Sequence, residues 1–197
     1  MTRPREWDET EVLDRALETF WQKGYEGTSI GDLTEATGLA RASLYGAFGD
    51  KEKLYARVVE HYLARADAHV TGAPRVPDEA TTHERLAGLF AAWMGPRCAT
   101  VDARGCFLAL AGTQGGEPGI ARELLAANMR RREKQILEIL REGQARGEVS
   151  GGRDATALAR MLVLVTQGAS SSARAGWTAA RLDQAVREAI DLVAPTR

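Results

Sequence analysis

One stretch of this chain, residues 27–55, constrains its fold more than any other: GTSIGDLTEATGLARASLYGAFGDKEKLY. Ser29 stands before small or apolar residues at helical spacing, and Asp32 follows three positions later, a pattern typical of a capping box at a helix start. Gly38 stands where such a helix would end in a left-handed conformation, which glycine adopts without steric cost. A second helix over about 40–48 would turn Leu44 and Phe48 toward the interior. The pattern predicts two short helices joined by a tight turn.

A third helix is predicted to follow at once. Asp50 precedes Lys51 at a position where its carboxylate can cap the helix that begins there. The amino end of that helix carries unpaired backbone N–H groups, which attract a phosphate. Two short helices around a turn, followed by a further helix, are the arrangement of helix-turn-helix DNA-binding proteins.

The same residues resemble the DNA-binding domain of the TetR/AcrR family of bacterial repressors. The resemblance covers residues 9–62 and rests on an amphipathic first helix and on the motifs G-Y-x-G-T-S-I, A-x-x-x-G-L, S-L-Y-x-x-F and G-D-K-E-x-L-Y. It implies an all-α fold with two domains: residues 1–50 would bind DNA, and residues 51–197 would bind an effector and dimerise. It also implies a dimeric repressor of a double-stranded DNA operator, which a small molecule releases. Activation in place of repression stays open, because that depends on where the operator lies.

Arg41 is predicted to read the bases, by bidentate hydrogen bonds to guanine, with Ser43 and the methyl group of Ala42 as lesser contacts. Other residues would hold phosphates, and Arg3 and Arg5 form a short basic arm that could reach the backbone or the minor groove. Two positions depart from the family: Ala40 lacks a capping side chain, and Gly46 replaces a bulky residue, so that only its backbone can approach the duplex. The predicted DNA-binding residues are Thr28, Ser29, Arg41, Ala42, Ser43, Tyr45, Gly46 and Lys51.

Charge argues weakly against this interpretation. Residues 1–53 hold seven basic and eleven acidic side chains, a net charge of −4, whereas nucleic-acid-binding domains are usually basic. The acidic residues gather on the first helix, which we expect to face away from DNA. The motifs outweigh the charge, although non-specific affinity should be modest.

The rest of the chain predicts further helices. They are expected over about 82–94, ended by Gly95 and Pro96, then over 103–113, 118–146, 154–174 and 179–193. The triplet of arginines at 130–132 is interpreted as a solvated helix face. The sequence has a net charge of −1 and neither a signal peptide nor a long apolar run, which predicts a cytoplasmic protein with no membrane segment.

The last two helices are predicted to form a dimer seam. The first of them is apolar around much of its circumference, which is typical of a central or interfacial helix. Ordinary core is the alternative, and the family resemblance favours the dimer. The predicted interface residues are Leu158, Leu162, Val165, Leu182, Val186 and Ile190.

An effector pocket is predicted among the C-terminal helices. Gln167 and Ser171 are polar residues within an apolar helix and therefore need partners, which an effector, the backbone or water could supply. The apolar candidates could equally be plain core. The predicted effector-binding residues are Phe90, Trp93, Met94, Cys106, Phe107, Leu110, Gln114, Met129, Gln167 and Ser171.

Three alternatives remain open. Cys106 lies near Arg104 in a Gly-Cys-Phe sequence that resembles one in electrophile- and oxidant-sensing members of the family. It could be a thiol sensor or a buried inert thiol. A bridge to Cys98 is possible. Cys106 could instead be the nucleophile of an enzyme, given a distant histidine. The protein could also bind ligands after losing DNA binding. No sequence pattern indicates a metal site or a cofactor.

Overall fold

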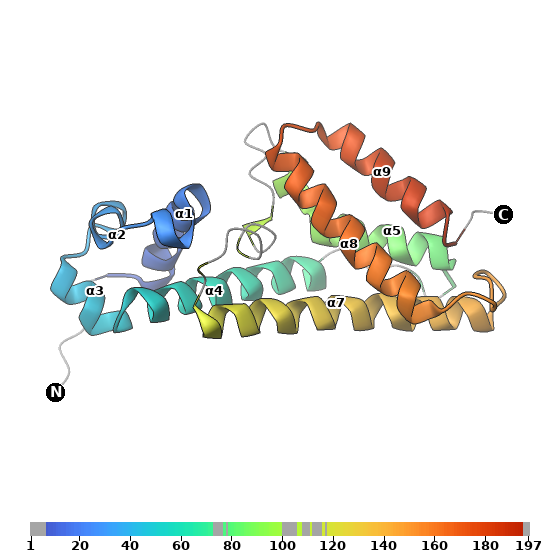
Figure 1. The fold of residues 1–197 in the computed structure, drawn as a ribbon, viewed down its shortest axis with the longest axis horizontal. Coiled ribbons are helices and arrows are strands. Elements are labelled where there is room, and N and C mark those ends of the chain that lie inside the picture. The colour runs from blue at the N-terminus through green and yellow to red at the C-terminus, as the bar shows by residue number, and fades with distance from the viewer. Residues whose placement is uncertain are drawn as a thin grey trace. The chain divides into compact units, whose positions relative to one another are not determined.

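The computed structural model describes residues 7–72, 77, 79–99, 106, 107, 111, 116 and 118–194, without the side chains of residues 69 and 95–99. The regular elements in these residues are helices, and none of them is a strand, so the predicted all-α class is confirmed. Figure 1 shows the helices α1 (Glu9–Gly27), α2 (Ile30–Thr37), α3 (Arg41–Phe48), α4 (Lys51–Gly72), α5 (Thr82–Ala99), α7 (Gly119–Ala145), α8 (Ala155–Arg174) and α9 (Ala179–Asp191).

The chain divides into two compact units. The first comprises Met1–Arg65 and Leu110–Leu125, and the second comprises Ala66–Ala109 and Ala126–Arg197. The first unit therefore extends past residue 50, the domain boundary expected from the sequence. Aromatic contacts give the physical reason, because the Tyr55 ring of α4 packs edge-on against Phe20 of α1, with 4.9 Å between ring centroids.

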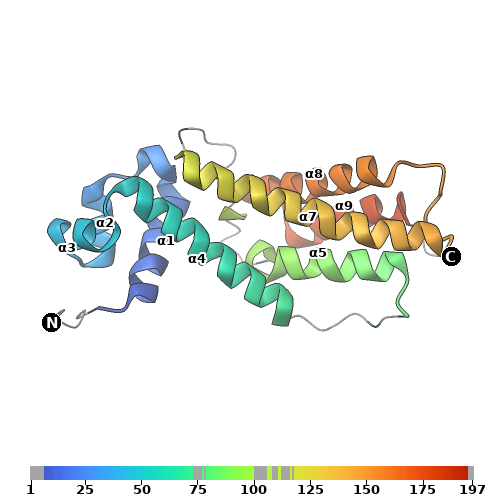
Figure 2. The same cartoon turned by 90° about the horizontal axis from the view of Figure 1, so that it is seen from below.

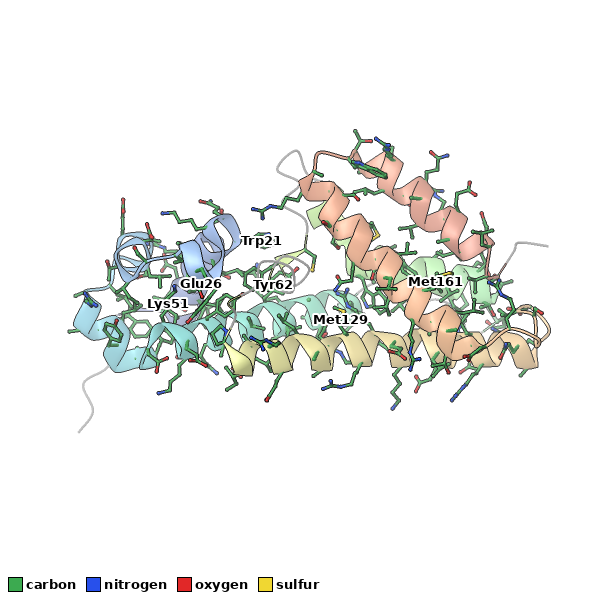
Figure 3. The ribbon with its side chains drawn as sticks, viewed as in Figure 1. Trp21, Glu26, Lys51, Tyr62, Met129 and Met161 are labelled. Atoms are coloured by element: carbon green, nitrogen blue, oxygen red, sulfur yellow. The ribbon has the colours of Figure 1, made fainter. Side chains whose placement is uncertain are left out.

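In the first unit, α1 buries the apolar face that its sequence predicts. Trp21 of α1 also packs edge-on against Tyr62 of α4, with 5.6 Å between ring centroids (Figure 3). Gly24 interrupts α1 with a φ of 72°, and a further turn then reaches Gly27. The buried residues of α1 are Val12, Leu13, Ala16, Leu17, Thr19, Phe20 and Gly24.

In the second unit, α5, α7, α8 and α9 enclose an apolar core. Figure 2 shows α5 and α7 running beside each other, and α8 packs against α9. The fully buried members of this core include Leu86 of α5, Ile136 and Leu140 of α7, Leu162 of α8 and Leu182 of α9. Among the described residues, no helix is long and apolar enough to cross a membrane.

Two predictions about helix ends have opposite outcomes. The expected start at 154 is confirmed, because Asp154 caps α8 by accepting a hydrogen bond of 2.8 Å from the Thr156 amide. The predicted stop at Gly95 and Pro96 is wrong, since α5 continues to Ala99. An interior proline lacks one helix hydrogen bond and crowds the carbonyl four residues earlier, which favours a kink, but its φ suits a helix and α5 continues through it. Of the helix expected over 103–113, only Cys106, Phe107 and Ala111 are described.

Candidate nucleic-acid interface and interior site

The turn between α2 and α3 has the predicted local chemistry. Ser29 and Asp32 form a complete capping box: the Asp32 amide donates to Ser29 Oγ at 3.1 Å, and the Ser29 amide donates to Asp32 Oδ2 at 2.7 Å. Gly38 ends α2 in the left-handed conformation with a φ of 72°. Ala40 occupies the N-cap of α3 without a side-chain hydrogen bond. These features hold α2 and α3 at a defined turn.

Helix α3 is anchored on one face and open on the other. Leu44 and Phe48 are buried at 3% and 8% exposure, as their spacing predicts. The guanidinium carbon of Arg41 lies 5.5 Å from the centroid of the Tyr45 ring, which steadies both side chains on the open face. The exposed residues of α3 are Arg41, Ala42, Ser43, Tyr45 and Gly46, the five that the sequence assigned to DNA.

Thr28 is a correction to the predicted interface. Its side chain is 1% exposed, and its hydroxyl donates a hydrogen bond of 2.6 Å to the Gly24 carbonyl. The hydroxyl therefore closes the broken end of α1 and is unavailable to a phosphate. Ser29 is exposed, but its hydroxyl also donates to Asp32 Oδ2 at 2.7 Å, so the amides at the start of α2 are the better phosphate donors.

The start of α4 carries Lys51, a predicted phosphate contact, between two acidic residues. Asp50 caps the helix by accepting from the Lys53 amide at 2.8 Å, and that bond holds the pKa of Asp50 below its usual value. The Lys51 ammonium lies 4.3 Å from the centroid of the Tyr25 ring, a cation–π contact. Burial, followed by the nearby Glu52 carboxylate, raises the pKa of Tyr25, so the ring stays neutral beneath the lysine.

The acidic residues of α1 are paired with bases that a charge count over residues 1–53 leaves out. Arg57 of α4 lies 2.8 Å from the Glu9 carboxylate, and this pairing raises the pKa of Arg57. His61 Nε2 lies 2.8 Å from Asp14, which also pairs with Arg65. The net charge of −4 therefore overstates the field that DNA would meet, because α4 supplies neutralising groups.

The predicted effector-binding residues fall into several environments. Phe90 and Phe107 are buried, whereas Trp93, Met94, Cys106, Met129 and Gln167 are partly buried. Leu110 and Gln114 lie outside the described residues, as do the side chain of Cys98, Arg104 and the basic arm of Arg3 and Arg5. Ser171 is a correction, because it is exposed on the outer face of α8 and is not enclosed with the others.

The predicted dimer residues also need correction. Five of the six, all except Val165, are at most 5% exposed within a single chain and belong to the core of the second unit. They are therefore covered by their own chain, and the alternative left open by the sequence, ordinary core, describes them. Leu182, Val186 and Ile190 of α9 meet Phe90 and Met94 of α5 around a largely apolar cavity of about 260 Å³.

A functional candidate that sequence reasoning missed is Arg132. The expected solvated face at 130–132 is wrong for this residue, which is 8% exposed, although Arg130 and Arg131 are exposed. The signal was present in the spacing, because Asn128, Arg132, Ile136 and Leu140 follow one another at intervals of four along α7 and share its buried face. Among the residues the structure describes, no group of three or more His, Cys, Asp or Glu side chains could hold a metal ion.

The open face of α3, presented by a tight turn after α2, which packs against α1, defines the chain as a helix-turn-helix DNA-binding protein. Comparison with known proteins agrees. The model of bacterial regulatory proteins of the tetR family matches residues 12–58, and the model of the tetracyclin repressor-like C-terminal domain matches residues 82–189. The chain therefore belongs to the TetR family of bacterial transcriptional regulators, which are not enzymes, so the enzyme alternative for Cys106 is set aside.

Individual relatives span nearly the whole chain. The HTH-type transcriptional repressor ComR of Escherichia coli K12 is 35% identical over 183 residues, covering 92% of this chain and 87% of ComR. The regulator YezE of Bacillus subtilis 168 is 32% identical over 169 residues, covering 82% of this chain and 84% of YezE. A cysteine mutant of the TetR family transcriptional regulator CifR, complexed with 26-bp double-strand operator DNA, matches with a TM-score of 0.79 and 32% identity, covering 98% of this chain and 100% of CifR.

Proposed function

We propose that this protein is a dimeric repressor that binds a near-palindromic operator through α3 and releases it when a small molecule binds the second unit. The observation that carries the proposal is the open face of α3, on which five neighbouring DNA candidates are exposed while Leu44 and Phe48 anchor the helix. The structure of CifR with operator DNA, at 32% identity, supports the same use of this domain. Residues 1–50 would read DNA, and residues 51–197 would dimerise and bind the effector.

Each exposed group has a role that follows from its chemistry. Arg41 reads guanine through its two-pronged guanidinium, and Ala42 and Ser43 make lesser contacts to base edges. Gly46 lets the duplex approach the backbone closely because it has no side chain, and the surface there is open, since a methyl group built on it would meet no protein atom within 4 Å. Tyr45, Lys51 and the amides that follow Ser29 contact phosphates and set the register of α3 on the DNA.

The outer face of α8 is the surface we assign to the dimer in place of the buried residues. It carries uncharged side chains at alternating intervals of four and three residues, the spacing of a helix–helix seam. Leu164 at its centre is 71% exposed, and together with the uncharged residues in line with it on the same face it gives a surface that a second chain could cover. A pair of chains joined here would present two copies of α3 to successive major grooves, about 34–36 Å apart. The residues of this face are Ala157, Met161, Leu164, Gly168 and Ser171.

Fluorescence anisotropy tests the proposal directly. DNA from the region upstream of the protein's own reading frame is compared with scrambled DNA at two salt concentrations. We expect tight, sequence-selective binding at two chains per site, weakening as salt rises because phosphate contacts release counterions. Equal and weak binding to every DNA fragment of a genomic library would instead support a ligand-binding protein that no longer reads DNA.

A further inference from the structure

Arg132 is a buried cation for which the described part of the chain supplies no carboxylate. It is 8% exposed, and none of the residues that the structure describes forms an ion pair with it. Its neighbour Arg131 shows the usual arrangement, since both of its terminal nitrogens lie 2.5 Å from the Asp67 carboxylate and the pairing raises its pKa. Arginine is seldom buried this far unless an anion accompanies it.

The one ring that Arg132 meets among the described residues does not replace a carboxylate. The guanidinium carbon lies 4.9 Å from the centroid of the Trp93 ring of α5, a cation–π contact. Such a contact uses the face of the guanidinium and leaves its N–H groups, which lie in the guanidinium plane, able to donate. Those N–H groups can donate two parallel hydrogen bonds to one carboxylate.

Two carboxamide oxygens in the same unit also find no hydrogen-bond donor among the described residues. Asn128 is 6% exposed, and within the described part of the chain its Oδ1 accepts no hydrogen bond. The same is true of Oε1 of Gln167, whose Nε2 reaches only the weakly accepting sulfur of Met129, at 3.0 Å. A buried carbonyl oxygen that accepts no hydrogen bond lowers the stability of the folded state. A donor on a bound molecule would therefore stabilise either oxygen.

A short series of contacts connects these groups within the second unit. Asn128 precedes Arg132 by one helical turn on the buried face of α7, and Met129 stands between them in sequence. Met129 links α7 to Gln167 of α8, and Trp93 links Arg132 to α5. Figure 3 shows Met129 in this region of the second unit. The cation and the two acceptors thus belong to two helices, α7 and α8, that Met129 joins, and Trp93 of α5 lies against the cation.

We propose that Arg132, Asn128 and Gln167 bind the effector, and that the effector is a small carboxylic acid with an apolar body and a separate hydroxyl or N–H group. The carboxylate would pair with Arg132, the donor would reach the carboxamide oxygens, and the apolar body would lie against Trp93 and Met129. A single cation matches the single charge of a carboxylate better than the double charge of a phosphate monoester. The inference rests on the proposed function only in taking this ligand to control DNA binding.

Thermal unfolding of the full-length protein tests the site without DNA. The probes are 4-hydroxybenzoate and 3-hydroxyoctanoate, their neutral amides, the plain acids benzoate and octanoate, and inorganic phosphate. We expect at least one hydroxy acid to raise Tm more than its amide, its plain acid and phosphate do, because binding to the folded state alone stabilises it. In Arg132→Met the hydroxy acid should raise Tm no more than its amide does, because its affinity should fall by about tenfold or more. Arg130→Met removes the same charge from an exposed neighbouring position and should respond as wild type.

The ligand-free Tm of Arg132→Met separates a binding role from a structural one. If the cation serves a ligand, replacing it with an apolar side chain of similar length should leave the ligand-free Tm unchanged or raise it. A lower Tm with ligand responses intact would overturn the proposal. Should Arg132→Met fail to fold, Asn128→Leu replaces it, and it should erase the advantage of the hydroxy acid over the plain acid.

Two further results would also overturn the inference: equal effects of every acid and its amide on wild type, or binding of phosphate alone. Anisotropy with operator DNA is measured on the same samples. Operator binding that persists while no acid acts would reject the carboxylate site and leave the DNA-binding function standing. If an acid raises Tm but the protein binds no operator, the carboxylate site would stand and the DNA-binding function would be rejected.

Discussion

Lys23, near the end of α1, forms an ion pair with Asp32, the residue that completes the capping box of α2. The pairing with Lys23 is the main reason that the pKa of Asp32 lies well below its usual value, and the hydrogen bonds from Ser29 add to it. One carboxylate therefore caps the first helix of the helix-turn-helix motif and ties it to α1.

This carboxylate should make stability depend on pH in acid. Because its pKa is lower in the folded state, its contribution is complete above the unfolded value of about 4 and is lost as pH falls through the folded value. We expect Asp32→Asn to be less stable than wild type at pH 7, with the difference shrinking as pH falls below about 4. Urea unfolding at several pH values measures this, and Glu35→Gln, an exposed acid on the same helix, is the control. A difference that stays constant down to pH 2 would remove Asp32 from this role.

Arg41→Ala should weaken operator binding without unfolding the protein. The side chain is exposed and its recorded contact is with Tyr45 of the same helix, so the fold does not depend on it. A bidentate contact to guanine is worth about 1–3 kcal/mol of discrimination, and its loss should relax specificity at one base pair. Anisotropy with operator variants measures this beside Arg15→Ala on α1. Unchanged affinity in a variant with native circular dichroism would exclude Arg41 as a reader.

Gly46→Ala and Gly38→Ala should have opposite effects on stability. A Cβ at either glycine meets no atom within 4 Å, but Gly38 has a φ of 72° whereas Gly46 is helical. Alanine should therefore cost about 1–2 kcal/mol at position 38 and stabilise by up to about 1 kcal/mol at position 46. We expect Gly46→Ala alone to combine a higher Tm with weaker operator binding, because the methyl group would meet the duplex. A more stable variant with full affinity would show that DNA does not approach Gly46 closely.

Leu164→Glu should separate the dimer while each chain stays folded. Leu164 is 71% exposed in the single chain, so a carboxylate there does not disturb the core. Ile120→Glu, at a position 52% exposed on α7, is the matched control and should stay dimeric. Sedimentation velocity measures both variants. The buried Leu162, at 0% exposure, cannot serve in this test, because Glu there would disrupt the core. A Leu164→Glu dimer as stable as that of Ile120→Glu would move the interface elsewhere.

The helix-turn-helix motif was largely predictable because its signals are local. The cap at Ser29, the left-handed Gly38 and the inward pair Leu44 and Phe48 each depend on residues within four positions along the chain. Backbone geometry and short-range hydrogen bonds decide such features before any tertiary contact forms. The exposed face of α3 followed from the same spacing.

By itself, then, the sequence determined the helical class, the motif and the family, whereas the roles of individual side chains beyond the motif depended on tertiary structure. Burial of Leu162 and Leu182 in their own chain, and not in a dimer, follows from how α8 and α9 pack against α5 and α7. Arg132 looked like a surface residue in a basic triplet until packing placed it over Trp93, 39 positions earlier. Helical periodicity says which residues share a face, but the partner that covers that face comes from a distant segment, and only the folded chain brings the two together.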